Sequence, residues 1–267
     1  MSSFFLYLLM SNTNPIGLFD SGIGGTSIWS AIHERLPKES TIYLADSKNA
    51  PYGLKSKEVI IALCKKNTEL LLEMNCKMIV VACNTATTNA IKELRASYKI
   101  PFIGIEPAIK PAATQSKTQT IGILATKGTL SSELFNKTVE LYQETKIIEQ
   151  IGYGLVELIE SGGINSPEME KLLITYLTPM IEANIDFLVL GCSHYPYLIP
   201  KIRKLIPNHI QIIDSGEAVA RQTEKILENE VGFNSDNKTT NLFYSNADLT
   251  VLKELIGDQY SVQYRDF

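Results

Sequence analysis

Residues 78–91, MIVVACNTATTNAI, and residues 186–199, DFLVLGCSHYPYLI, share one pattern. In each stretch a run of apolar residues ends at a cysteine, Cys83 or Cys192, and polar residues that suit the start of a helix follow. A buried strand that leads into a helix is typical of a parallel sheet, and open α/β sheets bind ligands at the carboxyl ends of such strands. The pattern predicts an α/β fold with both cysteines at ligand-binding edges.

The rest of the chain alternates between strand and helix signals in the same way. Apolar runs at 16–19, 41–45, 78–82 and 102–105 are separated by helical patterns, which indicates mainly parallel sheets flanked by helices. The rhythm restarts at residue 121, 105 residues after residue 16, and the two cysteines are 109 residues apart. The similar offsets predict two pseudo-symmetric α/β domains with the active site in the cleft between them.

The predicted domain bounds follow from this repeat. The last strand signals, NLFYS and YSVQY, are expected to return to the first domain and make it discontinuous. The expected units are an extension at 1–13, a first domain at 14–107 plus 217–267, and a second domain at 108–216. The extension carries an apolar run from Phe4 to Met10, which is far shorter than the roughly 20 residues that a membrane span needs.

The amino-acid composition indicates which kind of molecule this chain binds. The chain has 267 residues, and 25 Lys and Arg against 29 Asp and Glu with no basic block, which argues against nucleic acid and a membrane surface. Its four cysteines lack the spacing of a disulfide framework, so reduced thiols and a cytoplasmic location are expected. A small molecule is the favoured partner.

Cys83 and Cys192 differ from the other two cysteines in their surroundings. Cys64 and Cys76 lie in apolar segments and are expected to be buried and inert, whereas Cys83 and Cys192 precede small hydrogen-bonding residues. A helix N-terminus favours the thiolate, so we expect the pKa of these two thiols to move from about 8.5 toward neutrality. Two such thiols on opposite faces of an α-carbon could invert it, one as base and one as acid.

Five segments carry a family resemblance: FDSGIGG (19–25), APYGLKS (50–56), ACNTAT (82–87), LVELIE (155–160) and GCSHYP (191–196). Together they resemble the glutamate racemases of the cofactor-independent aspartate/glutamate racemase family. The resemblance implies an isomerase that interconverts L- and D-glutamate without a cofactor and supplies D-glutamate for peptidoglycan. It also implies two α/β domains with the active site between them, and a homodimer.

The resemblance assigns roles by position. It makes Cys83 and Cys192 the catalytic acid/bases, with Asp20 assisting Cys83 and His194 assisting Cys192. The substrate-binding residues that it implies are Asp20, Ser21, Tyr52, Gly53, Asn84, Thr85, Thr126, Thr129, Glu160, Ser193 and His194. The chain departs from the family pattern at Ser193, where a threonine is usual, and in ADSKNA (45–50), where the family more often has a Gly-Asp-Thr-Ala-Arg type of stretch.

Other interpretations of these motifs remain. GIGG (22–25) could bind phosphate, but it lacks the lysine of a P-loop and the full dinucleotide-binding spacing. Cys192 and His194 could hold a metal, but no second pair of ligands with zinc-site spacing is evident, so no metal is expected. Asp20 with Ser21 could be a simple helix cap, and Tyr52 with Gly53 a simple turn.

Two alternative functions also remain. An aspartate racemase or another amino-acid racemase of the family would share both cysteines, although a glutamate usually stands there in place of His194. A non-catalytic, two-lobed small-molecule binding protein would share the fold and need neither thiol. Separate serine substitutions of the two cysteines distinguish a racemase from a binding protein.

Overall fold

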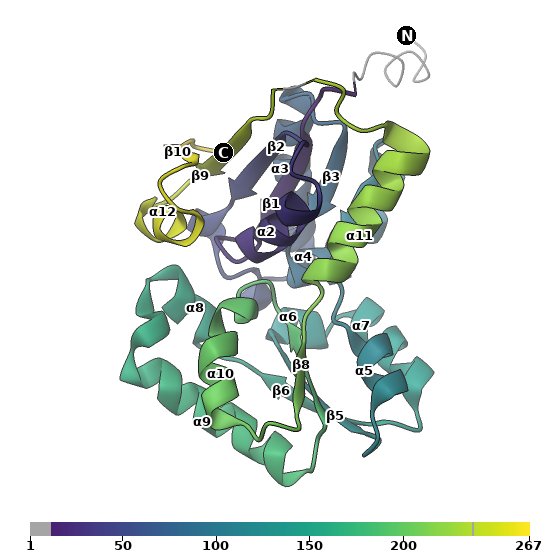
Figure 1. Ribbon diagram of the computed structural model, residues 1–267, viewed down its shortest axis with the longest axis vertical. Helices are drawn as coiled ribbons and strands as arrows, with labels where there is room; N and C mark the ends of the chain where they lie inside the picture. Colours follow the sequence, from purple (N-terminus) through teal and green to yellow (C-terminus); the bar gives the residue numbers. More distant parts are fainter. Residues whose placement is uncertain (1–11, 237) are drawn as a thin grey trace.

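The computed structural model describes residues 12–236 and 238–267 and contains two all-parallel sheets, which form the upper and lower parts of the molecule in Figure 1. The six-stranded sheet has the order β10-β9-β2-β1-β3-β4 and the four-stranded sheet the order β6-β5-β7-β8. The strands are β1 (Ile16–Asp20), β2 (Thr41–Ala45), β3 (Met78–Val81), β4 (Phe102–Gly104), β5 (Thr120–Ala125), β6 (Lys146–Ile151), β7 (Phe187–Gly191), β8 (Gln211–Ile213), β9 (Asn241–Ser245) and β10 (Ser261–Tyr264).

Helices flank both sheets. They are α2 (Thr26–Arg35), α3 (Lys57–Glu73), α4 (Asn84–Ser97), α5 (Ile109–Gln115), α6 (Lys127–Leu130), α7 (Glu133–Val139), α8 (Leu155–Glu160), α9 (Pro167–Glu182), α10 (Ile199–Leu205), α11 (Gly216–Ile226) and α12 (Thr250–Ile256). Because helices cover the two faces of the first sheet, its central strands β1, β2 and β3 are buried along their whole length. This explains why they read as continuous apolar runs.

The two sheets place their cysteines equivalently. β3, which precedes Cys83, is the direct neighbour of β1, and β7, which precedes Cys192, is the direct neighbour of β5. Phe19 is level with Val81 in the first sheet, and Ala125 is level with Gly191 in the second. The predicted α/β class with two related halves is therefore confirmed, and each cysteine follows a strand beside the first strand of its sheet.

The chain enters the second sheet once and returns once. After β4 it passes through α5 into β5, and after β8 it returns through α11, which packs against α2. β9 then pairs with β2 and β10 with β9, so the predicted return of the late strands to the first sheet is confirmed. The exact domain bounds remain a prediction, but all strands of the second sheet fall between residues 120 and 213.

The start of the fold is tied down by a buried ion pair. Residues 1–11 of the predicted extension lie outside the described residues, whereas Asn12 offers its carbonyl oxygen to Lys77 Nζ at 2.7 Å. Lys77 also pairs with Glu39 at 2.8 Å, and both side chains are at most 3% exposed. Within the part of the chain that the structure describes, no helix is long and apolar enough to cross a membrane.

Candidate active site

The predicted site residues meet where the carboxyl ends of the two sheets face each other. Hydrogen bonds join the two parts directly: Ser193 Oγ donates to Asp20 Oδ1 at 3.2 Å, and the hydroxyls of Thr85 and Thr126 lie 2.7 Å apart. Ser27 Oγ adds a bond to the carbonyl oxygen of Ser193 at 2.8 Å. Loops that are far apart in the sequence therefore form one continuous, buried polar site.

Cys83 caps α4, as the strand-to-helix pattern predicts. Its Sγ accepts a hydrogen bond from Ala86 N at 3.5 Å, and its thiol donates to Ser21 Oγ at 3.6 Å. The expectation of a lowered pKa is wrong for this thiol. Burial, reinforced by the negative charge of Asp20, raises the pKa of Cys83 well above its ordinary value and outweighs the two hydrogen bonds. Cys83 is therefore a thiol in this state of the site.

Asp20 ends β1 and is completely buried beside Cys83. Its Oδ2 accepts from Gly22 N at 3.2 Å and from Gly25 N at 3.0 Å. Burial raises the pKa of Asp20, while the charge of His194 and the Gly25 amide oppose that rise. A side chain at Gly25 would bring a Cβ within 2.7 Å of Asp20 Cβ, so this close turn requires glycine.

The GIGG loop binds side chains of this protein and not a phosphate. Two of its amides serve Asp20, Ile23 N donates to Glu160 Oε1 at 2.7 Å, and Gly24 N lies 3.2 Å from His194 Nε2. Because three of these four amides already donate to carboxylates and the fourth faces the His194 ring, the loop lacks the open amide nest that a phosphate needs. Its function is to assemble the polar groups around the cysteines.

Cys192 has a different environment from Cys83. It follows β7, but helix α10 begins only at Ile199, after a 3₁₀ turn at Tyr195–Leu198, so Cys192 does not cap a helix. The residue beside its thiol is instead His194, whose Nδ1 lies 3.8 Å from Cys192 Sγ. The predicted pairing of His194 with Cys192 thus agrees with the geometry, whereas the predicted helix start at Cys192 is wrong.

Glu160 contacts His194, which in turn contacts Cys192. The last residue of α8, it places Oε1 2.5 Å from His194 Nε2, on the ring edge opposite Cys192. Burial acts to lower the pKa of His194, but its bonds with Cys192 and Glu160 prevail and raise that pKa well above its usual value. The imidazole is therefore protonated at neutral pH, which places a positive charge beside Cys192.

Asn84 presents unused hydrogen-bonding capacity next to Cys83. Its side chain is buried, and neither its amide nitrogen nor its amide oxygen has a partner among the described residues. Since buried polar atoms are nearly always paired, this amide is well suited to a ligand with both donors and acceptors. The neighbouring hydroxyls of Thr85, Thr126 and Thr129 lie 2.7–3.2 Å from one another and extend the polar wall.

The side chain of Tyr52 points into the protein interior. Its hydroxyl donates to Asp46 and lies 3.1 Å from Asn67 Nδ2, so the side chain is committed to the interior. Gly53 packs against Thr126, whose Cβ would lie 2.9 Å from a Cβ at position 53. Contact of Tyr52 and Gly53 with a substrate stays a prediction. Because the Tyr52 hydroxyl is already hydrogen-bonded and Gly53 has no side chain, such a contact would use the backbone groups of this loop.

Sequence reasoning assigned no role to Asp46, Ser47 or Asn246. Asp46 is fully buried and accepts from Tyr52 and from Asn246 Nδ2, the latter at 2.6 Å, while Ser47 Oγ donates to Glu160 Oε2 at 3.0 Å. Asp46 and Ser47 lie in the ADSKNA stretch (45–50). The departure of this stretch from the family pattern was the only sequence feature that pointed to these two residues. No group of three potential metal ligands occurs among the described residues.

Comparisons with known proteins identify the family of this chain. Residues 17–223 match the family described as Asp/Glu/Hydantoin racemase. The chain is 44% identical to the glutamate racemase of Ralstonia pickettii over 244 residues, which are 91% of this chain and 86% of that protein. A glutamate racemase isoform from Bacillus anthracis has a similar structure, with a TM-score of 0.87 and 30% identity over 96% of this chain and 99% of that one.

A third relative was crystallised with its substrate. The Escherichia coli glutamate racemase, in complex with L-glutamate and the activator UDP-MurNAc-Ala, matches this fold with a TM-score of 0.85 and 30% identity. The match covers 95% of this chain and 98% of that one.

Proposed function

Since this chain belongs to the Asp/Glu/hydantoin racemase family, we propose that Cys83 and Cys192 are the two acid/base groups of a glutamate racemase. The enzyme interconverts L- and D-glutamate. The observation that carries the residue assignment is the equivalent placement of the two thiols, each following the strand beside the first strand of its sheet. They are close enough that the charge of Cys192 contributes to the raised pKa of Cys83.

The proton transfer uses the thiols in opposite forms. One cysteine enters as thiolate and removes the α-proton, which leaves its electron pair on the α-carbon, and the other enters as thiol and delivers a proton to the opposite face. The resting arrangement suits this division, because burial keeps Cys83 a thiol while a protonated His194 lies beside Cys192. After turnover the forms are exchanged, and the reverse reaction starts from that state.

The buried polar groups hold the substrate during this transfer. The unpartnered amide of Asn84 and the hydroxyls of Thr85 and Thr126 are placed to bind the carboxylates and the ammonium group of glutamate. Asp20 and His194 lie next to the thiols and tune their protonation. A site closed to water strengthens each of these interactions when charge develops on the α-carbon.

The expected cellular compartment follows from the use of D-glutamate. We place the reaction in the cytoplasm, where D-glutamate is consumed in peptidoglycan synthesis, and the four free cysteines suit a reducing compartment. We further propose that the chain acts as a homodimer and that the domains divide at 14–107 plus 217–267 and at 108–216. The dimer is tested by light scattering of the purified protein.

Circular dichroism of L-glutamate incubated with the protein tests the activity directly. With no cofactor added, the signal should decay to zero as the racemic mixture forms, and it should decay much more slowly with L-aspartate. Cys83→Ser and Cys192→Ser should each abolish the decay. Retention of activity in either variant would contradict the two-thiol assignment, and faster decay with L-aspartate would favour an aspartate racemase.

A further inference from the structure

We propose that Ser47 is a positioning residue for Cys192, because it holds Glu160 against His194 only when the two parts of the protein close on each other. The inference rests on the proposed racemase function and adds a residue that the family motifs do not single out. It concerns the ADSKNA loop, which connects β2 to α3.

The carboxylate of Glu160 is held by three groups. Oε1 accepts from Ile23 N at 2.7 Å and lies 2.5 Å from His194 Nε2, while Oε2 accepts from Ser47 Oγ at 3.0 Å. Ser47 is therefore the partner that fixes the second oxygen. Without it the carboxylate could rotate about its terminal torsion, which is intrinsically soft, and its alignment with His194 would loosen.

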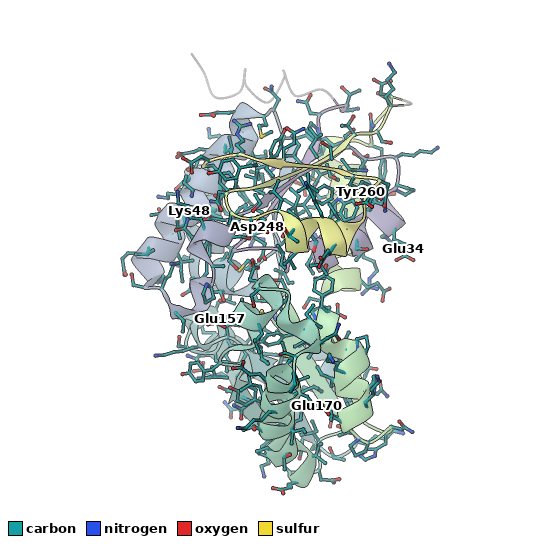
Figure 2. The ribbon with its side chains drawn as sticks, turned by 90° about the vertical axis from the view of Figure 1, so that its left-hand side faces the viewer. Glu34, Lys48, Glu157, Glu170, Asp248 and Tyr260 are labelled. Atoms are coloured by element: carbon teal, nitrogen blue, oxygen red, sulfur yellow. The ribbon has the colours of Figure 1, made fainter. Side chains whose placement is uncertain are left out.

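Ser47 and Glu160 come from opposite sides of the cleft. Ser47 begins the 3₁₀ turn Ser47–Asn49 after β2 of the first sheet, whereas Glu160 ends α8, which packs with the second. Figure 2 shows Lys48, the residue after Ser47, in the upper part and Glu157, on the same helix as Glu160, at the top of the lower part. The hydrogen bond thus joins the two parts and breaks when they separate.

The loop that carries Ser47 is itself fixed on the first sheet. Asn246, which follows β9, donates through Nδ2 to Asp46 at 2.6 Å and accepts from Lys48 N at 2.9 Å. The residues on both sides of Ser47 are therefore bonded to one side chain. Ser47 presents its hydroxyl to Glu160 from a rigid support and not from a mobile loop.

The Ser47–Glu160–His194 chain contacts Cys192 directly and reaches Cys83 only through the charge that His194 exerts on Asp20. Glu160 orients His194, and His194 contacts Cys192, whereas the groups nearest Cys83 are Ser21 and Asp20 from the first sheet. Loss of the Ser47 hydroxyl should therefore impair proton removal by Cys192 and leave proton removal by Cys83 intact. A residue with a merely structural role would affect both directions alike.

Ser47→Ala tests this with an assay that needs a single base: elimination of HCl from each enantiomer of a β-chlorinated glutamate. The enantiomer that depends on Cys192 is identified as the one whose elimination Cys192→Ser abolishes. For it we expect kcat to fall about tenfold in Ser47→Ala, the scale of one hydrogen bond to a charged group. For the other enantiomer the rate should stay within about twofold, as should both KM values.

The pH profile provides a second readout. A loosened Glu160 supports the protonated imidazole less, so the pKa of His194 falls and the alkaline limb of the Cys192-dependent elimination moves to lower pH. Ser47→Thr keeps the hydroxyl and should restore the wild-type rates and profile. Ser56→Ala is the matched control, since it removes a serine that caps α3 in the same connection without contacting Glu160.

Equal losses for both enantiomers, or an unchanged Cys192-dependent rate, would overturn the proposal. Ser47→Gly also lacks the hydroxyl and must show the same selective loss of the Cys192-dependent elimination. It serves as the second variant if Ser47→Ala folds poorly. Failure of the proposed function looks different, because the wild-type protein would then racemise no glutamate at all.

Discussion

Replacement of Lys77 by methionine should destabilise the protein severely without touching the active site. The ammonium group lies 2.8 Å from Glu39, and the two side chains are 1% and 3% exposed. At that distance the attraction is about 6 kcal/mol for an effective dielectric constant of about 20, and desolvation of both charges offsets much of it. The variant loses the attraction but keeps the buried carboxylate of Glu39, so we expect a cost of about 3–5 kcal/mol.

Thermal melting and urea unfolding measure this cost. For a chain of this size the loss corresponds to a fall in melting temperature of roughly 10 °C. Lys137→Met is the matched control, because Lys137 pairs with Glu133 at the surface with both side chains at least 66% exposed, and its melting temperature should not change. The double variant Lys77→Met with Glu39→Gln should recover much of the loss. A cost below about 1 kcal/mol, typical of a surface pair, would refute the reasoning.

Three further predictions concern the active site and the chain start. Cys83→Ser should abolish HCl elimination from one enantiomer of a chlorinated glutamate and Cys192→Ser from the other; equal losses for both enantiomers in both variants would exclude the two-base assignment. Asp20→Asn and His194→Asn should lower kcat on the order of ten- to a thousandfold, and more than they weaken substrate binding, in line with general acid–base contributions. Steady-state kinetics that show an unchanged kcat and a large rise in KM would make them ordinary binding residues. Deletion of residues 1–9 should leave the racemisation rate unchanged and alter only solubility or self-association, and a folded, assembled but inactive truncation would contradict this.

The sequence predicted what depends on neighbouring residues. Apolar runs identified the central strands because these are buried on both faces, and the polar residues after Cys83 identified a helix start that the structure contains. The return of NLFYS and YSVQY to the first sheet is the long-range exception, expected once the repeat had divided the chain into two halves. The pairing of His194 with Cys192 came from the resemblance, and the distance between them agrees with it.

The sequence could not predict what depends on tertiary burial and long-range contact. A helix N-terminus favours a thiolate, but the pKa of Cys83 rises because surrounding residues remove it from water, and no local pattern reports that. The bond from Ser47 to Glu160 spans 113 positions, and the bond from Asn246 to Asp46 spans 200. Such pairs become visible only when the sheets are assembled.

Under the proposed mechanism, the burial of Cys83 and Cys192 makes opening a part of each turnover. Cys83 and Cys192 are 4% and 6% exposed, and we infer that glutamate reaches them when the two parts separate and the bonds between Thr85 and Thr126 and between Ser193 and Asp20 break. Closure then removes water and restores those bonds around the substrate. Because the thiols, and the groups that set their protonation, are divided between the two parts, the same motion that admits glutamate also dismantles the acid/base system. The proposed two-thiol mechanism therefore confines proton transfer to the closed state, where the carbanion is protected from solvent.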